Sequence, residues 1–405
     1  MNTHPSILGG ACLIANVCVG AGMLGLPSAG AGAWIFWSLF ALILTMSVLL
    51  LSGWMLLEAY QGLPFKVSFN TLTQHSLGTT WTIINSISVY FVGAILLYAY
   101  ISSLGGLAES ILGFNSKISA IVLVLFFSAF VWHSTKAVER ISLIFIVFLI
   151  SSFLLGTTDL LSNVNINTLL NLDEKAHNAP YALAMFPVAL TAFGYHHSVS
   201  TMRDHYQDES RAKYALFWGV LIALGLYTIW LISVYGNLSR PHFMVINEAG
   251  GNVDALLGVM GTVLNTQHIE NALHTFSVAA ILSSFVGVGL GMFDFLADLF
   301  GFKDSRTGRA NTWLVTFIPP LLMSLALPFG FVVAIGYAGA IATIWACFIP
   351  ALLVLKKRQQ RPEKEDKFKT PGGQFSVYLV IVFGALTALF HILNMLNVLP
   401  QYSSL

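Results

Sequence analysis

A short glycine-rich stretch near the start of the chain could offer backbone groups to a ligand. It runs from Gly20 to Pro27 (sequence GAGMLGLP) inside an apolar segment that covers residues 7–32. Glycine lacks a Cβ atom, so it lowers helix stability and permits non-helical backbone angles. The stretch predicts a discontinuous helix whose free N–H and C=O groups serve a ligand. The alternative is that these glycines only let neighbouring membrane helices pack closely.

A second interruption lies in a later apolar segment. Residues 192–198 (sequence AFGYHHS) place two adjacent histidines and a tyrosine within the apolar run 179–202. Such side chains are costly in lipid and should face a polar cavity. Interrupted helices at corresponding positions of two halves indicate a transporter site. The alternative is that His196 and His197 only bond neighbouring backbone.

Together the two interruptions could bind a zwitterionic amino acid. We expect the N–H groups of Ala21, Gly22 and Met23 to bind the carboxylate, because they begin the second half-helix and lie at its positive end. Carbonyl groups near Val19 and Phe193 end the first half-helices and could accept from the ammonium group.

The side chain of the amino acid would need an apolar slot with a few polar anchors. Phe193 and Tyr195 could form its wall or lid, and Tyr98 is a further candidate unless it is an ordinary packing residue. The predicted substrate-binding set comprises Val19, Gly20, Ala21, Gly22, Met23, Tyr98, Phe193, Gly194, Tyr195 and His196.

Two sets of residues could couple transport to an ion. Ser283 and Ser284, with carbonyls of the first break, could hold sodium through neutral oxygen atoms, although membrane serines also bond helix carbonyls routinely. His196 and Asp294 are titratable and could carry a proton. Asp294 shares a helix face with Ser284, whereas Asp298 lies nearer the helix end, where basic residues could neutralise it.

The composition sets the class of protein. Of the 405 residues, 56% are hydrophobic and 9% are charged, against about 25% charged residues in soluble proteins. The chain is therefore predicted to be an all-α polytopic membrane protein. A net charge of +1 without a basic run argues against a nucleic-acid partner. The cysteines Cys12, Cys18 and Cys347 match no zinc motif, and the N-terminus lacks a cleavable signal.

The apolar runs predict about eleven transmembrane helices within a single domain over residues 1–405. They cover residues 6–31, 33–60, 80–112, 117–133, 140–156, 179–200, 212–238, 268–301, 310–328, 330–355 and 374–398.

Basic residues indicate the orientation. With the N-terminus in the cytoplasm, sixteen of the nineteen Lys and Arg residues fall on the cytoplasmic side, as the positive-inside rule requires. Only Lys117, Lys175 and Arg240 fall outside. Eleven spans then place the C-terminus on the opposite side of the membrane from the N-terminus.

Four motifs of this sequence resemble the bacterial aromatic amino acid permeases, the tyrosine- and tryptophan-specific transporters of the hydroxy and aromatic amino acid permease family. They are residues 20–27, 192–196, 284–298 and 336–339, and the resemblance covers nearly the whole chain. The family usually has glycine and then proline after the histidine of the sixth span, where this chain has His197 and Ser200.

The resemblance implies the LeuT-like 5+5 inverted repeat of the amino acid–polyamine–organocation superfamily, with broken helices 1 and 6. The first repeat would cover residues 1–156, the second residues 179–355, and helix 11 residues 374–398. It also implies import of an aromatic amino acid, tyrosine before tryptophan, across the bacterial inner membrane. Proton symport is expected, since the resembling permeases use the proton-motive force, with sodium as the alternative ion.

Other function classes fit less well. The sequence has no Gly-x-Ser-x-Gly, His-Glu-x-x-His or phosphate-binding Gly-Lys-Ser motif, so it is not expected to be an enzyme or to need a cofactor or metal. A channel would need a continuous polar stripe on several helices, and the polar positions are isolated. Nothing in the sequence demands more than a monomer in the lipid bilayer.

Overall fold

A computed structural model describes residues 5–171, 178–264, 267–327, 330–360 and 368–402. Within these ranges the chain is helical and contains no strand, which confirms the all-α class. In the described part of the chain, eight stretches of helix are long and apolar enough to cross a membrane. They are α4 (Trp34–Tyr60), α6 (Thr79–Leu112), α7 (Ser116–His133), α8 (Thr135–Ser162), α12 (Glu209–Tyr235), α15 (Gln267–Phe300), the joined α17 and α18 (Phe331–Gln360) and α19 (Gly373–Met395).

The first and sixth predicted spans are each interrupted, as the sequence predicts. The first is divided into α1 (Ile7–Cys18), α2 (Ala21–Leu24) and α3 (Leu26–Ala29). The sixth is divided into α10 (Ala182–Ala192), the 3₁₀ turn η2 (His196–Ser198) and α11 (Val199–Tyr206). A π-helical turn, η3 (Ile344–Phe348), separates α17 (Phe331–Thr343) from α18 (Ile349–Gln360).

The ninth predicted span, residues 310–328, corresponds to α16 (Arg306–Ala326), which is not among the eight apolar helices. Residue 328 lies outside the described residues. The long connection between α12 and α15 contains two helices, α13 (His242–Glu248) and α14 (Val253–Leu264). The count of eleven spans therefore stays a prediction. The remaining short helices are α5 (Phe69–Leu77), α9 (Ile166–Leu170) and η1 (Ala179–Tyr181).

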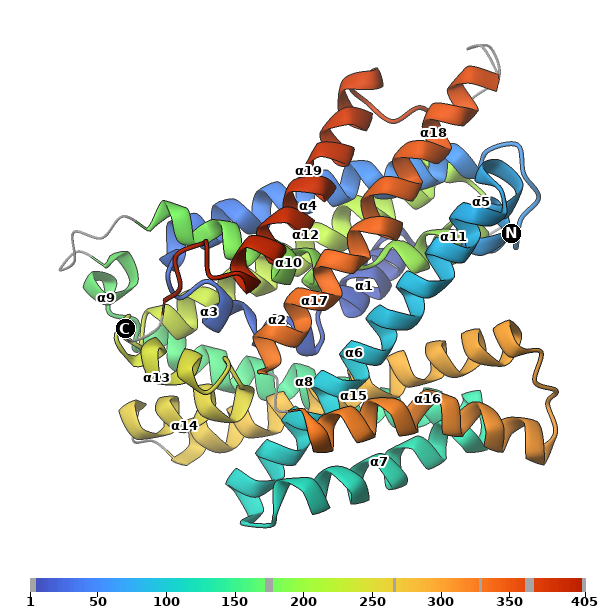
Figure 1. Cartoon of the computed structure of the whole chain (residues 1–405). Coiled ribbons are helices and arrows are strands. Elements are labelled where there is room, and N and C mark those ends of the chain that lie inside the picture. The colour runs from blue at the N-terminus through green and yellow to red at the C-terminus, as the bar shows by residue number, and fades with distance from the viewer. Residues whose placement is uncertain (1–4, 172–177, 265–266, 328–329, 361–367, 403–405) are drawn as a thin grey trace.

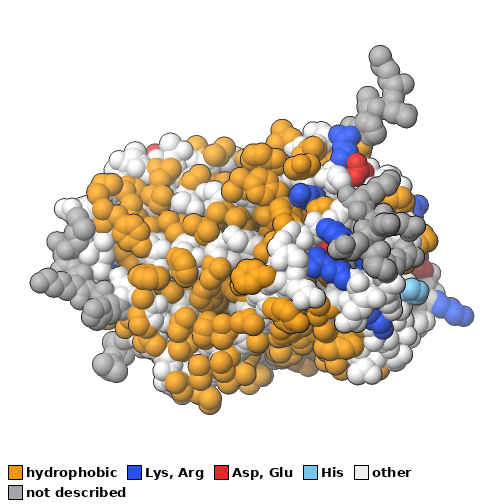
Figure 2. All heavy atoms as spheres, turned by 90° about the horizontal axis from the view of Figure 1, so that it is seen from above, with side chains coloured by type: hydrophobic (Ala, Val, Ile, Leu, Met, Phe, Trp, Pro, Cys, Tyr) orange, Lys and Arg blue, Asp and Glu red, His pale blue; other side chains and the backbone are white. Residues whose placement is uncertain are grey.

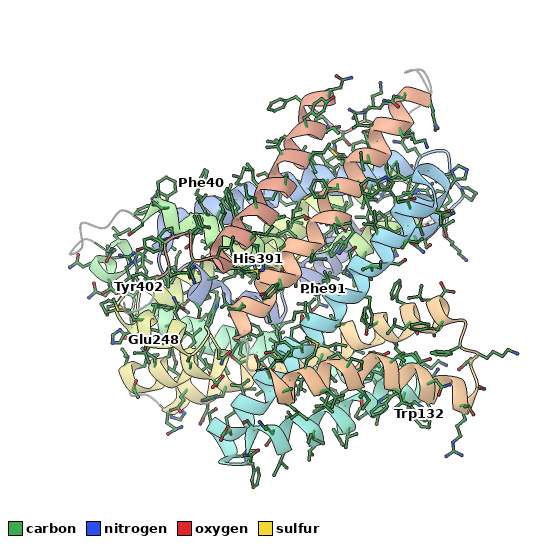
Figure 3. All side chains as sticks on the ribbon, in the orientation of Figure 1. Phe40, Phe91, Trp132, Glu248, His391 and Tyr402 are labelled. Carbon is green, nitrogen blue, oxygen red and sulfur yellow. The ribbon has the colours of Figure 1, made fainter. Side chains whose placement is uncertain are left out.

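The interrupted helices lie inside the bundle and the uninterrupted ones surround them (Figure 1). α1 packs along α12, α10 packs against α17 and α4, and α8 packs along α15. One close approach depends on glycine: a Cβ atom on Gly339 of α17 would overlap the carbonyl oxygen of Pro187 in α10. Large apolar side chains such as Phe40 and Phe91 are 50% and 40% exposed, as expected beside lipid, and Figure 3 shows Phe40 at the edge of the bundle.

The two ends of the bundle differ in charge. Figure 2 shows Lys and Arg side chains gathered toward one end of the molecule and apolar side chains over much of the rest of that face. The first described residues lie at this basic end and the last described residues lie at the opposite end (Figure 1). Lys175, one of the three basic residues expected on the outer side, lies outside the described residues, as do Arg361, Lys364 and Lys367 of the cytoplasmic group.

At the basic end, a buried carboxylate joins three helices. Glu58 at the end of α4 is fully buried and accepts from Arg358 Nε at 2.7 Å and Nη2 at 2.9 Å. It also accepts from the backbone N–H of Thr370 at 2.7 Å, just before α19. Lys357 donates to the carbonyl of Gln61 at 3.1 Å. The ends of α4, α18 and α19 are thereby tied together.

At the opposite end, an arginine and a cluster of aromatic rings close the bundle. Arg240 is 6% exposed, and its Nη2 donates to the carbonyl of Gly32 at 2.9 Å. The ring of Tyr402 stacks on the guanidinium at 4.3 Å, and Figure 3 shows Tyr402 at this end of the molecule. Trp34 stacks on Tyr235 with ring centroids 4.4 Å apart.

Two glycines face each other near this same end. Gly250 lies in the turn between α13 and α14 with φ 78°, and Gly330 directly precedes α17. A Cβ atom on Gly250 would lie 2.5 Å from the Cα atom of Gly330. A Cβ atom on Gly330 would overlap the carbonyl oxygen of Gly250.

Candidate functional site

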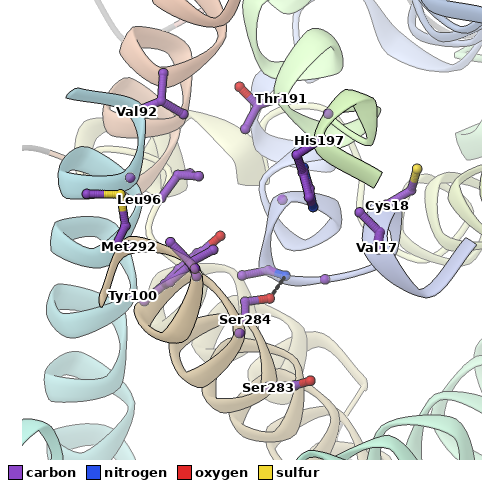
Figure 4. Close-up of a pocket in the computed structure, with 18 of the residues that line it drawn as sticks. Val17, Cys18, Val92, Leu96, Tyr100, Thr191, His197, Ser283, Ser284 and Met292 are labelled. Carbon is purple, nitrogen blue, oxygen red and sulfur yellow. Dashed lines mark hydrogen bonds between the residues drawn. The ribbon is translucent and has the colours of Figure 1, made fainter. Parts of the chain in front are cut away.

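A cavity of about 490 Å³ lies where the two interrupted helices meet (Figure 4). The first break contributes residues 16–22, and the second contributes Gly194 and His197. The wall opposite is formed by α6 and α15. The residues that line it are Asn16, Val17, Cys18, Val19, Gly20, Ala21, Gly22, Phe69, Val89, Val92, Gly93, Leu96, Tyr100, Thr191, Gly194, His197, Ser283, Ser284, Gly287, Val288, Gly291, Met292 and Trp345.

The backbone opens at the first break because Gly20 leaves the helical conformation. Gly20 is extended, with φ −141° and ψ −153°, so α1 ends before it and α2 begins after it. The N–H of Ala21 donates to the Ser284 hydroxyl at 3.0 Å, which joins this break to α15 (Figure 4). A Cβ atom on Gly20 would lie 2.6 Å from that hydroxyl oxygen. A larger residue at position 20 would therefore have to displace the Ser284 hydroxyl.

The second break is held by turns and by a bond to α17. The N–H of Tyr195 donates to the carbonyl of Phe193 at 2.9 Å, and that of Gly194 to Thr191 at 3.1 Å. The Thr191 hydroxyl donates to the carbonyl of Ile335 in α17 at 2.9 Å. The turn η2 then carries the chain into α11.

One tyrosine lies between the two breaks. The hydroxyl of Tyr227, on α12, is 2.7 Å from the carbonyl oxygen of Cys18 and 2.7 Å from that of Ala192. These are the last residues of α1 and α10. Tyr227 is fully buried. One side chain of a third helix is therefore bonded to the ends of both half-helices.

The predicted site residues divide into two groups. Val19, Gly20, Ala21, Gly22, Gly194, Ser283 and Ser284 line the cavity. Met23, Tyr98, Phe193, Tyr195 and His196 are buried and do not line it. Asp294 is exposed on α15 and also lies outside the cavity lining. The structure thus brings the backbone positions and the serines together, and the roles of all these residues in binding stay predictions.

The aromatic side chains of the second group bond elsewhere in the fold. The Tyr98 hydroxyl donates to the carbonyl of Leu327 at 2.8 Å. Phe193 packs edge-on against Tyr227 with ring centroids 5.1 Å apart. The Tyr195 hydroxyl donates to the carbonyl of Leu49 at 3.0 Å. In this conformation none of the three forms the wall or lid that the sequence suggested.

His196 belongs to a buried chain of hydrogen bonds. Its Nε2 lies 3.1 Å from the Ser52 hydroxyl, which donates to the carbonyl of Ala346 in the π-helical turn η3. Because Ser52 gives its proton to Ala346, the imidazole Nε2 must be the donor to Ser52. The Nδ1 atom then carries the lone pair, and it is buried without a hydrogen-bond partner among the described residues.

The side chain of His197 points away from that of His196. It is exposed, and Figure 4 shows its ring pointing into the cavity near Cys18. The sequence placed the imidazole of the site at His196, whereas the structure puts His197 at the surface of the cavity. The two residues diverge because successive side chains in a helical turn point in different directions.

The sequence did not identify several lining residues. Tyr100, Thr191 and Trp345 line the cavity beside the apolar Leu96 and Met292. Tyr100 lies two positions after Tyr98, on the other side of α6. Trp345 lies in the π-helical turn, and an apolar sequence does not indicate where such a turn occurs. Among the described residues, no group of His, Cys, Asp and Glu could hold a metal ion.

Comparisons of the sequence with known proteins identify relatives of this chain. The sequence model of the tryptophan/tyrosine permease family matches residues 3–391. The chain is 44% identical to a tryptophan-specific transport protein of Shigella flexneri, over 99% of this chain and 98% of that protein. It is 39% identical to a low affinity tryptophan permease of Escherichia coli K12, over 97% of both chains. It is 34% identical to a tyrosine permease of Enterobacter agglomerans, over 99% of both chains.

Proposed function

This chain belongs to the tryptophan/tyrosine permease family, and we propose that it is a secondary active transporter that imports an aromatic amino acid by alternating access. It is a multi-pass membrane protein and a transport protein rather than an enzyme. We further propose that it acts as a monomer in the bacterial inner membrane with its N-terminus in the cytoplasm. The basic residues gathered at one end of the bundle support that orientation (Figure 2).

The observation that carries this proposal is the cavity shared by both helix breaks. Broken helices that meet at one cavity present backbone donors and acceptors to a zwitterion without a buried formal charge. The two breaks also occur at the first and sixth apolar segments, which supports a LeuT-like repeat of five helices after five.

We propose tryptophan as the preferred substrate, ahead of the tyrosine that the sequence suggested. The cavity wall opposite the breaks is mostly apolar, with Val92, Leu96, Val288 and Met292 around the single phenol of Tyr100. An indole ring offers more apolar area than a phenol and has one N–H to satisfy. The tryptophan-specific relative is also more similar to this chain than the tyrosine permease, at 44% against 34% identity.

The described conformation has its cavity extended toward the basic end. Its lining includes Val89 and Val92 in the first half of α6, Gly291 and Met292 in the second half of α15, and Phe69 of α5. These positions lie near the ends where Lys66 and Lys303 occur, whereas Arg240 closes the opposite end. With the N-terminus inside, this is an inward-facing state.

For the coupling ion we propose a proton carried by His196, with Asp294 as the second candidate. His196 adjoins the cavity residue His197 and has a buried, unpartnered ring nitrogen among the described residues. The Ser284 hydroxyl already accepts from Ala21, which reduces its availability to sodium.

The test is uptake by purified protein in liposomes, with proton and sodium gradients imposed separately at fixed membrane potential. We expect a pH gradient alone to drive accumulation of tryptophan, with tyrosine and phenylalanine as weaker competitors. Replacing His196 by Gln should abolish accumulation while exchange of tryptophan across the membrane persists.

Accumulation driven by sodium alone, and lost in Ser284→Ala, would overturn the proton assignment in favour of the two serines. Uptake that does not saturate would instead indicate a channel. Absence of saturable uptake of any aromatic amino acid would overturn the proposed function itself.

A further inference from the structure

The hydroxyl of Tyr227 lies where the two half-helices end, and each helix end has a negative partial charge. The carbonyls of Cys18 and Ala192 close α1 and α10, and each lies 2.7 Å from this one oxygen atom. Helix C-termini carry about half a negative charge each, so two such ends facing one another need a positive partner or a donor. Tyr227 supplies that donor from α12.

A phenol has one proton, and here two carbonyls compete for it. The Cys18 carbonyl also accepts from the N–H of Gly20 at 3.1 Å, so both of its lone pairs are in use. A further donor can bond to the Cys18 carbonyl only by displacing one of these two. Cys18 lines the cavity, whereas Ala192 does not.

We propose that Tyr227 is a positioning residue that transmits occupancy of the cavity from α1 to α10. This inference rests on the proposed function, because the occupant that acts is the ammonium group of an amino acid. When that ammonium donates to the Cys18 carbonyl, it displaces the phenol proton, which then bonds to Ala192 alone. Binding at the first break thereby tightens the bond that holds the end of the second half-helix.

Among the described residues, the hydrogen bonds of the Tyr227 hydroxyl go to the carbonyls of Cys18 and Ala192. The residue is fully buried, so water does not reach its ring. The ring of Phe193, the first residue beyond α10, packs edge-on against it at 5.1 Å. A movement of the Tyr227 ring would therefore also move Phe193, the residue that follows the end of α10.

The same helix offers a matched control. Tyr235 lies eight residues further along α12, is also fully buried, and donates to one carbonyl, that of Pro27, at 2.9 Å. Tyr235→Phe removes a buried hydroxyl from α12 without touching either helix end at the cavity. A merely structural role of buried hydroxyls predicts similar effects of the two substitutions.

The experiment compares Tyr227→Phe and Tyr235→Phe with the unaltered protein in liposomes, measuring tryptophan binding and tryptophan exchange separately. Without the phenol proton the Cys18 carbonyl, which lines the cavity, remains open to the ammonium. We therefore expect Tyr227→Phe to bind tryptophan within about threefold of normal, the scale of one hydrogen bond. Its exchange rate should fall about tenfold or more, since gating is a separate step from binding. Tyr235→Phe should change neither quantity by that much.

A second measurement uses the unaltered protein and does not depend on the variant folding. Amide hydrogen exchange is followed at residues 190–195 with tryptophan, and with indole-3-propionate, which lacks the ammonium group. We expect tryptophan alone to slow exchange there. Equal amide protection by both compounds would overturn this inference while tryptophan transport stood. Equal rates of tryptophan exchange across the membrane for Tyr227→Phe and Tyr235→Phe would do the same. No transport by the unaltered protein would overturn the proposed function.

Discussion

Neighbouring residues at a helix break can have opposite environments, and the two histidines illustrate this. His196 turns inward to the Ser52 hydroxyl and is 2% exposed. His197 faces the cavity. The sequence could locate the break, because glycine and histidine at membrane depth need an explanation. It could not decide which ring reaches the cavity, because a 3₁₀ turn and an α-helix direct these two side chains differently.

At this scale, Gly20→Ala should weaken tryptophan binding more than Gly22→Ala does. A Cβ atom on Gly20 would lie 2.6 Å from the Ser284 oxygen and would force apart its hydrogen bond with Ala21. The shift would displace the Ala21 N–H that is expected to bind the carboxylate, and loss of one hydrogen bond to the substrate corresponds to about a three- to tenfold lower affinity. A Cβ atom on Gly22 meets only ordinary contacts, at 3.5 Å or more from Ala192. Equilibrium binding to the two purified variants is the measurement; equal affinities would contradict this geometry.

A second prediction concerns the pH dependence of stability. Burial, aided by the nearby Glu109 carboxylate, raises the pKa of Asp254 in α14 above its ordinary range. The folded state therefore favours the neutral acid, and this contribution is full below the unfolded-state pKa and is lost as the pH rises through the folded-state pKa. Asp254→Asn should accordingly raise the melting temperature at pH 7 and have less effect near pH 4. Thermal unfolding in detergent at both pH values tests this, and an equal effect at both would argue against it.

At the scale of elements, the breaks were predictable but the faces of the intact helices were not. The first break is marked by glycines, and the structure opens the chain there. α6 is apolar on all sides, so hydrophobic periodicity cannot separate its cavity face from its lipid face. Tyr98 was expected at the site, yet it bonds to Leu327 while Tyr100 lines the cavity. The packing of α6 against α15 and α17 determines which of these two tyrosines faces the cavity.

The joint of α4, α18 and α19 gives a prediction at this scale. Glu58→Gln removes the buried charge that neutralises Arg358 and holds the N–H of Thr370. Breaking a buried ion pair costs about 3–5 kcal/mol, and because Arg358 is 21% exposed we expect about 2–3 kcal/mol of destabilisation. The melting temperature in detergent should fall clearly, whereas Asp159→Asn, at an exposed position, should leave it nearly unchanged. Similar melting temperatures for both variants would show that the joint is not stabilising.

At the scale of the whole molecule, the sequence predicted a multi-pass helical protein with charge concentrated at one end. The composition requires a membrane environment, and the eight long apolar helices agree. The direction in which the cavity opens could not be predicted, because it depends on how closely distant residues approach one another. Arg240 and the rings of Trp34 and Tyr235 close one end only through contacts between separate helices.

This asymmetry predicts from which side of the membrane a water-soluble reagent can enter the cavity. In a background with the three native cysteines replaced by alanine, Gly291→Cys should react with a membrane-impermeant thiol reagent added from the cytoplasmic side only. A Cβ atom at Gly291 meets no neighbour, so the substitution should be tolerated. Phe114→Cys, exposed between α6 and α7 at the other end, should react only from outside. Labelling of both from the same side would contradict the proposed topology.

The contact between Gly250 and Gly330 has a consequence for the genetics of this chain. A harmful substitution is often suppressed by a smaller residue at the position opposite, but each of these positions already faces the smallest residue available. No substitution at one position can therefore make room for a larger residue at the other. In a saturation mutagenesis library both positions should tolerate no other amino acid, and a screen for suppressors of Gly330→Ala should recover none at position 250.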